Sequence, residues 1–413
     1  MKRIWQSIGP AIVVAAVVLG PGSILTSSKV GAGFGLTGVP VIAMATVLMI
    51  AMVALAARIG VIYERSACEE LAARLGRPAA IGIGLILYVL VALFQSSNNL
   101  AVVAGLAPLA EMFTKGEPIG LITQINLLVL FNAFVILCLY RMRSLYGSIE
   151  RLMKLLIAVM VAAFLFNFAV AWLTPRGPIT PPTERGDLFA LLGMIGTTFS
   201  VAGAFYQSYL VREKGWGLAE ARRGVLDSIL SISVLGMVTM IILLTAYRTF
   251  YGLSPAVTLA SVDDVARQME PLFGAGATVV FCLGIIAGAF SSFLINSMIG
   301  GTVMSDALGK GSRLSQPWPL HLTTVSLLVG MGVAIASLAS AGSTVALITF
   351  AQALTVLGIP ALAAALLYLG TRAELTGERR VPRWIVGLAW LGLVVSILLA
   401  VRTALAVWEK WFG

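Results

Sequence analysis

Charged side chains are scarce in this sequence: Asp, Glu, Lys and Arg make up 11% of its 413 residues, whereas hydrophobic residues make up 59%. In a soluble globular domain about a quarter of the residues are charged. The composition therefore excludes an ordinary soluble protein and indicates a polytopic membrane protein. The formal net charge of +10 lies in short basic clusters between apolar runs, which is typical of membrane topology and not of a nucleic-acid-binding surface.

Cysteine, histidine and nucleotide-binding motifs are also scarce. The three cysteines are Cys68, Cys138 and Cys282, an odd number without paired spacing, so neither a disulfide framework nor a cysteine metal site is expected. No glycine-rich phosphate loop followed by Lys and Ser or Thr is present, and the polar loops are too short for a nucleotide domain. We therefore expect neither an enzyme nor an ATP-driven pump, and no cofactor.

The sequence does contain apolar runs of about twenty residues, the length at which a helix crosses a bilayer. We predict eleven, over residues 9–35, 39–60, 79–113, 120–140, 150–173, 187–211, 225–248, 272–307, 317–340, 343–370 and 384–407. With the N-terminus inside, twenty of the 28 Lys and Arg residues fall on the inner side, and Lys29 lies within the first run. This bias predicts a cytoplasmic N-terminus and an outer C-terminus in the inner membrane of a prokaryote.

Two of these runs are interrupted at about the same depth. In the first, the segment Gly20-Pro21-Gly22-Ser23 frees backbone groups that lipid cannot satisfy. In the sixth, residues 193–203 are rich in Gly, Ser and Thr. A single interruption of this kind is also compatible with a simple kink. Two interruptions five helices apart, however, are typical of an inverted-repeat transporter that works by alternating access around a midplane site.

The expected architecture is a single all-α transporter domain over residues 1–413. Repeat one covers about 1–175, repeat two about 185–371, and an additional helix about 384–407. Because each repeat holds five helices, an odd number, the second half must insert with the opposite topology. Helices one and six are then the broken pair.

Several short motifs along the chain carry a family resemblance. They are Gly9-Pro10, Gly20-Pro21-Gly22-Ser23, the segment 57–61, Asn99-Leu100-Ala101, the segment 193–198, the segment 287–292, and Gln352 with Pro360. Their order and spacing resemble the natural resistance-associated macrophage protein (Nramp) family of proton-coupled divalent metal transporters. The resemblance implies the leucine-transporter fold, with helices one and six broken.

The chain departs from that family at the residues that would hold the metal. Where metal-transporting members read Asp-Pro-Gly-Asn, this chain has Gly20 and Ser23, and where they place a Met it has Ser200. Thr197 stands where a carbonyl would contribute, and Gln352 is retained. The predicted substrate-binding residues are Gly20, Pro21, Gly22, Ser23, Thr197, Ser200, Gly203 and Gln352, and a metal would be held by Ser23, Thr197, Ser200 and Gln352.

Two classes of substrate stay open. Family descent implies a divalent metal cation, but a site without carboxylate or thioether is poorly matched to dehydrated manganese or iron. A hard ion that keeps several waters, such as magnesium, fits neutral oxygens better. The alternative is a small organic solute such as a carboxylate, bound at the amide ends of the half-helices. Because an acidic pair of the family is replaced by Asn99 and Val102, we expect little or no proton coupling.

Four further residues are pathway candidates, each with a plain alternative. Lys29 would draw an anion into an outer vestibule or extend to the membrane surface. Asn98 and Asn99 would line the pathway or form hydrogen bonds between helices. His321 would titrate near neutral pH or simply lie at the interface. The expected partners are membrane lipid and the transported solute or metal ion, with no nucleic acid; the oligomeric state is open, and a monomer is plausible.

Overall fold

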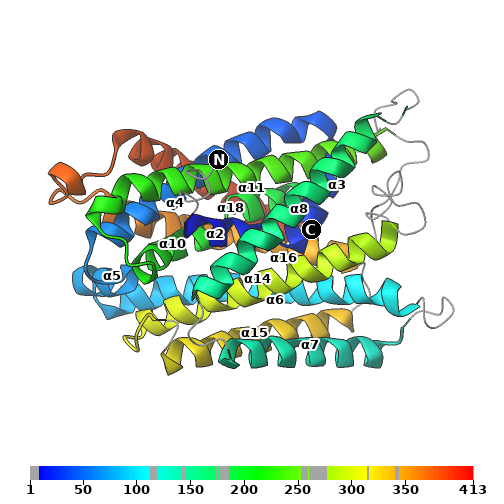
Figure 1. Cartoon of the computed structure of the whole chain (residues 1–413), viewed down its shortest axis with the longest axis horizontal. Helices are drawn as coiled ribbons and strands as arrows, with labels where there is room; N and C mark the ends of the chain where they lie inside the picture. The colour runs from blue at the N-terminus through cyan, green and yellow to red at the C-terminus, as the bar shows by residue number, and fades with distance from the viewer. Residues whose placement is uncertain are drawn as a thin grey trace.

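A computed structural model shows a chain folded almost entirely into helices that run along a common direction (Figure 1). The structure describes residues 9–111, 119–141, 146–173, 175, 186–252, 259, 277–313, 316–339 and 344–412. Within them, eight helical stretches are long and apolar enough to cross a membrane. The predicted class, an all-helical polytopic membrane protein, is confirmed.

Each predicted apolar run corresponds to one helix or to a broken helix. In chain order the helices are α2 (Ala11–Val18) with α3 (Pro21–Phe34), α4 (Gly38–Ile62), α6 (Arg77–Glu111), α7 (Leu121–Arg141), α8 (Tyr146–Leu173), α9 (Leu188–Thr198) with α10 (Val201–Glu213), α11 (Ala221–Phe250), α14 (Ala277–Ala307), α15 (Pro317–Leu338), α16 (Thr344–Leu354) with α17 (Ile359–Gly370), and α18 (Arg383–Phe412). The short helix α5 (Ala67–Leu75) connects α4 to α6, and 3-10 turns cover Gly35–Thr37 (η1), Leu218–Glu220 (η2), Thr355–Gly358 (η5) and Gly377–Arg379 (η6).

Helix α2 forms the centre of the bundle. All eight of its residues are buried, and it lies in the middle of the view against α11, α10 and α14 (Figure 1). Helices α7 and α15 lie along one edge of the bundle (Figure 1). They and α18 keep large apolar side chains on the outside, such as Ile122, Leu328 and Leu398. This distribution fits a lipid surround, in which exposed apolar surface has no hydrophobic cost.

The tenth predicted run is broken, which the sequence analysis did not anticipate. Its helix stops at Leu354, passes through the turn η5, and resumes as α17 at Ile359. Pro360 stands in the first turn of α17, where a missing amide proton costs nothing because that proton has no partner within the helix. The break therefore lies directly after Gln352, one of the predicted site residues.

A buried carboxylate fixes the beginning of α2. Asp227 on α11 is 0% exposed, and its two oxygens accept hydrogen bonds from the Gly9 amide at 2.6 Å and the Ala11 amide at 2.9 Å. The hydroxyl of Ser231 donates to the same carboxylate at 3.1 Å. Asp227 therefore satisfies amides that a helix start leaves without partners, and it lies at the positive end of the α2 dipole.

We expect Asp227→Ala to lower the free energy of unfolding by about 2 kcal/mol or more, because buried amides lose a charged acceptor. The measurement is unfolding in detergent micelles followed by tryptophan fluorescence. Ser231→Ala is the matched control, since it removes only one donor to the carboxylate and should cost less. Equal losses in the two variants would contradict this role for Asp227.

Candidate functional site

The first helix is interrupted at the predicted position. Helix α2 ends at Val18, Gly20 is extended with φ −80° and ψ 178°, and α3 begins at Pro21. The hydroxyl of Ser23 donates to the Val18 carbonyl, and Ser292 on α14 donates to the Val17 carbonyl at 3.0 Å. Two hydroxyls thus satisfy the carbonyl groups that the break frees.

The sixth helix is interrupted as predicted too. Helix α9 ends at Thr198, Ser200 has the non-helical angles φ −79° and ψ 83°, and α10 begins at Val201. Thr197 donates its hydroxyl to the Met194 carbonyl at 3.0 Å. Ser200 is only 6% exposed and does not cap α10 with its side chain.

The two broken helices pack against each other, with α10 against α2 and α9 against α3. On α10, a Cβ added to Gly203 would lie 3.1 Å from Val14 of α2, and on α9, a Cβ added to Gly193 would lie 3.0 Å from Thr26 of α3. These glycines let the helices approach closely. The structure thereby brings the two predicted interruptions into one region of the bundle.

Gln352 on α16 completes this region. A Cβ added to Gly22 would lie 2.2 Å from Gln352 Nε2, so the Gln352 amide lies directly over the first turn of α3. Its Nε2 donates to Ser97 Oγ on α6 at 2.7 Å. Its Oε1 is buried and has no hydrogen-bond partner. The structure therefore leaves one neutral oxygen acceptor available beside the first break.

Other buried polar atoms on the broken helices also lack hydrogen-bond partners. They are the hydroxyls of Ser27 and Thr198 and both polar atoms, Nε2 and Oε1, of the Gln207 amide. A buried polar group without a partner costs about 1–3 kcal/mol, and such groups call for water or a ligand. None of these residues was among the predicted site residues, nor were Ser97 and Ser292, although Ser292 ends one of the motifs that carry the family resemblance. In the sequence, each of these residues is visible only as a polar side chain within an apolar run. That pattern does not indicate whether the side chain faces a binding site.

The site region carries no carboxylate. No Asp or Glu occurs in residues 9–62, 188–212, 277–305 or 344–370, and the described residues hold no group of three or more His, Cys, Asp or Glu side chains placed for a metal. A Cβ added to Gly20 would lie 2.2 Å from Ser292 Oγ, so Ser292 occupies the space that a longer side chain would need. The oxygens at this site are neutral.

Lys29 forms an ion pair between the broken helices. Its Nζ lies 2.9 Å from Asp187 Oδ2, and the other oxygen of Asp187 accepts from the Phe189 amide at the start of α9. Neither alternative from the sequence included this partner. The pair compensates the charge of Lys29 and connects α3 to α9 at the end of the bundle opposite to Asp227 and α5.

The asparagine pair lies within a buried hydrogen-bond network. Asn98 donates to Gln95 Oε1 at 3.2 Å, Asn99 donates to the Gln95 carbonyl at 2.8 Å, and Asn132 on α7 donates to Asn99 Oδ1 at 2.6 Å. These contacts favour the helix-to-helix role of Asn99 over the pathway role. His321 is exposed at the start of α15, and its Nδ1 lies 2.9 Å from the Tyr140 hydroxyl.

A second buried carboxylate connects three helices near α5. Asp306, in the last turn of α14, accepts from Ser66 Oγ at 2.7 Å, from the Cys68 amide at 3.2 Å and from the Tyr209 hydroxyl of α10 at 2.7 Å. A cavity of about 320 Å³ lies beside Tyr209. Burial is the main reason why the pKa of the Cys68 thiol is raised, and the nearby Asp306 raises it further.

Comparison with known proteins identifies similar sequences and folds. The protein-family model described as Natural resistance-associated macrophage protein-like matches residues 11–406 of this chain. The divalent metal cation transporter MntH of Mesorhizobium japonicum is 25% identical over 431 residues, which cover 100% of this chain and 90% of the relative. The manganese transporter of Eremococcus coleocola superposes with a TM-score of 0.75 at 20% identity, covering 99% of this chain and 89% of the other.

A more distant structure has the same fold. It is a transporter of the nucleobase-cation-symport-1 family in a closed conformation with bromovinylhydantoin bound, and it superposes with a TM-score of 0.61 at 12% identity, covering 98% of this chain and 93% of the other. Together with the manganese transporter, it confirms the predicted leucine-transporter-like fold with two broken helices.

The contact between Gly22 and Gln352 yields a test of the site geometry. We expect Gly22→Ala to lower the free energy of unfolding by about 1–3 kcal/mol, because the added methyl overpacks against the Gln352 amide. In a Gln352→Ala background the same change should be nearly neutral, a coupling that a double-mutant cycle measures. Gly82→Ala is the control, since a Cβ at Gly82 would meet nothing within 4 Å. An additive double variant would contradict the contact.

Cys68 yields a second test. In a Cys138→Ser, Cys282→Ser background, we expect a maleimide at mildly alkaline pH to modify Cys68 at least about tenfold more slowly in the folded protein than in the denatured protein. The reason is that the buried thiol has a raised pKa and stays protonated, whereas the thiolate is the reactive form. Mass spectrometry follows the modification. Equal rates in the folded and denatured states would show that Cys68 is accessible.

Proposed function

Since the chain belongs to the natural resistance-associated macrophage protein-like family, we propose that it is a secondary transporter that carries a divalent metal cation across the membrane. The resemblance found in the sequence motifs is thereby confirmed. The relatives are transporters, and the chain is an integral membrane transport protein, not an enzyme. The identity of the ion, the alternating-access route and the orientation of the chain in the membrane are part of the proposal.

One observation carries the choice of ion: the buried Gln352 Oε1 has no hydrogen-bond partner in a region without carboxylates. The other oxygens there belong to hydroxyls and backbone carbonyls, with Ser23 and Thr197 among the hydroxyls. Such oxygens bind hard cations, and a cation that keeps several waters needs less charge compensation from the protein. The site therefore favours partly hydrated magnesium over dehydrated manganese or iron, although the relatives named above are described as divalent metal and manganese transporters.

A small organic solute is the second candidate. It is favoured by the first turns of α3 and α10, which point amides at the breaks. The ion pair between Lys29 and Asp187 weakens this candidate, because the charge of Lys29 is already compensated and attracts an anion less.

Alternating access has a physical basis in the contacts at the two ends of the bundle. At the predicted cytoplasmic end, Asp227 holds the start of α2 and Asp306 holds α10 through Tyr209. At the predicted outer end, Lys29 and Asp187 hold α3 to α9. We propose that these contacts open in turn while the two repeats, about 1–175 and 185–371, move around the breaks. The helix over about 384–407 lies outside the repeats.

The transport proposal predicts saturable magnesium or manganese uptake by proteoliposomes that contain the protein. Gln352→Ala should reduce the apparent affinity about ten- to a hundredfold, because the site loses its available amide oxygen, and Ser23→Ala should reduce it less. Gln124→Ala is the control, since Gln124 lies on the peripheral helix α7 and its side chain donates to the Ile119 carbonyl just before that helix. The absence of any divalent uptake would refute the metal proposal.

Two further measurements test the organic-solute candidate and the proton coupling. A carboxylate substrate would raise the thermal midpoint of the protein, and Gly22→Leu would abolish this effect. Because Asn99 is neutral and hydrogen-bonded to Asn132, we expect metal influx to acidify the vesicle interior little or not at all. Acidification in strict proportion to metal influx would contradict that expectation.

A further inference from the structure

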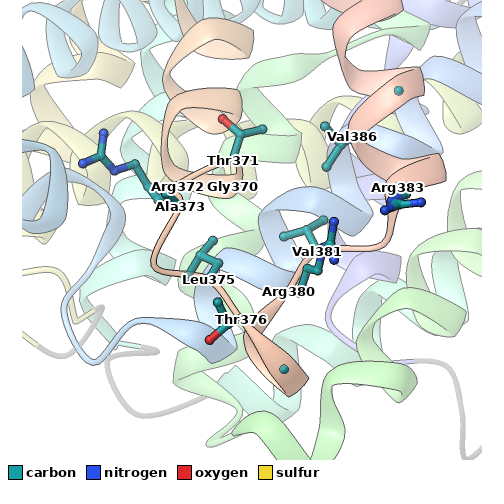
Figure 2. Close-up of a pocket in the computed structure, with 12 residues that line it drawn as sticks. Gly370, Thr371, Arg372, Ala373, Leu375, Thr376, Arg380, Val381, Arg383 and Val386 are labelled. Atoms are coloured by element: carbon teal, nitrogen blue, oxygen red, sulfur yellow. The ribbon is translucent and has the colours of Figure 1, made fainter.

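A cavity of about 570 Å³ lies away from the candidate site, where α17 ends and α18 begins (Figure 2). It is formed by the end of α17 at Gly370, the connecting segment 371–381, and the first turns of α18 up to Gly387. We call it the α17–α18 pocket. Its volume lies in the range of sites that bind small molecules or headgroups.

Arginines give this pocket a positive character. Arg372, Arg380 and Arg383 line it, and none of the residues that line it is acidic. Figure 2 shows Arg380 and Arg383 on the α18 side of the pocket, whereas Arg372 points to the opposite side, where it lies 5.0 Å from the Tyr368 ring. Because α18 begins at Arg383, the positive end of its helix dipole adds to the same side.

Two acidic residues, Glu374 and Glu378, adjoin the pocket in sequence, and neither lines it. Glu374 has a partner elsewhere. Glu374 forms an ion pair with Arg74 of α5, and this hydrogen bond lowers the pKa of Glu374. Glu374 therefore stays paired outside the pocket and does not compensate Arg380 and Arg383.

A buried arginine of α4 fixes the backbone of the pocket. Arg58 is 7% exposed, and its Nη2 donates to the Glu378 carbonyl and, at 2.9 Å, to the Arg380 carbonyl. Leu375 and Val381 are buried beneath the connecting segment. A pocket whose backbone is already fixed loses little conformational entropy when a ligand binds.

Exposed large apolar side chains follow the pocket along α18. Directly after Arg383, α18 exposes Trp384 and Trp390 by 46% and 51%, followed by Leu391 and Val394. Tryptophan side chains gather at the level of lipid headgroups, and the charge bias predicts that this end of α18 is cytoplasmic. Basic pockets between helices on that side bind the headgroups of anionic lipids.

From this arrangement we propose that the α17–α18 pocket binds the phosphate group of an anionic phospholipid of the cytoplasmic leaflet. Arg380 and Arg383 contact the phosphate, and Leu375, Val381 and Val386 face the glycerol and the first acyl carbons. The proposal goes beyond the transport function and does not depend on which substrate the protein carries.

The test uses the full-length protein in detergent and counts bound lipids by native mass spectrometry during titration with phosphatidylglycerol or phosphatidylcholine. We expect saturable binding of phosphatidylglycerol at one site. The Arg380→Gln, Arg383→Gln double variant should bind it more weakly by about fivefold per arginine. Arg379→Gln is the matched control, because Arg379 is exposed in the same segment but does not line the pocket, and it should bind nearly as the unmodified protein does.

A second variant tests the cavity without removing a charge. Gly387 lines the pocket, and a Cβ there would meet nothing within 4 Å, so Gly387→Leu narrows the pocket while α18 stays intact. We expect it to weaken saturable phosphatidylglycerol binding at least about fivefold and to leave the thermal midpoint in pure detergent unchanged. Gly82→Leu is its control, because Gly82 also has open space at its Cβ but lies on α6.

Glycerol phosphate and inorganic phosphate distinguish the source of the phosphate. If glycerol phosphate and inorganic phosphate compete only weakly with phosphatidylglycerol, and phosphatidylglycerol itself binds strongly, the ligand is the lipid. Equal competition by glycerol phosphate would overturn the lipid assignment and identify a soluble phosphate ester as the ligand. Equal binding of phosphatidylcholine, an equal loss in Arg379→Gln, or unchanged binding in Gly387→Leu would overturn the pocket itself.

Discussion

The lipid core offers no hydrogen-bond partner to a broken helix, and the centre of this structure is arranged around that constraint. At the first break, hydroxyls from Ser23 and Ser292 satisfy the carbonyls of Val18 and Val17. At the second, Thr197 satisfies the Met194 carbonyl. Because Ser292 comes from α14, the first break is stable only inside the assembled bundle. The breaks are therefore features of the fold that local flexibility alone does not explain.

The arrangement of charge follows from the same constraint. Carboxylates are placed at the helix ends, where Asp227 and Asp306 accept from amides and hydroxyls and Asp187 pairs with Lys29. Among the residues that the structure describes, the polar groups near the two breaks are neutral, because an uncompensated charge in the membrane interior is costly. In the transport mechanism that we propose, a cation at this site is stabilised by dipoles and by its remaining waters, and the charged contacts at the ends of the bundle control access.

Much of this architecture could be predicted from the sequence because it rests on local patterns. Apolar run length predicted the spans, and the placement of Gly and Pro predicted the breaks at Gly20 and near Ser200. The third break was missed, because Thr355, Val356 and Leu357 are as apolar as their surroundings and Pro360 is tolerated in the first turn of a helix. The role of Asp227 could not be predicted from a local pattern, since its partners at Gly9 and Ala11 lie more than 200 positions away.

The sequence by itself determined the membrane class, the succession of helices, the positions of two breaks and the lack of carboxylates in the central runs, all of which depend on residue composition over short windows. Only the tertiary structure decided which polar side chains meet. It placed Gln352 against Gly22 and against Ser97, 255 positions away, paired Lys29 with Asp187, and put Ser292 into the space beside Gly20. Such contacts depend on how helices from distant parts of the chain pack and rotate against one another, and that rotation is set by the whole core, which no local pattern encodes.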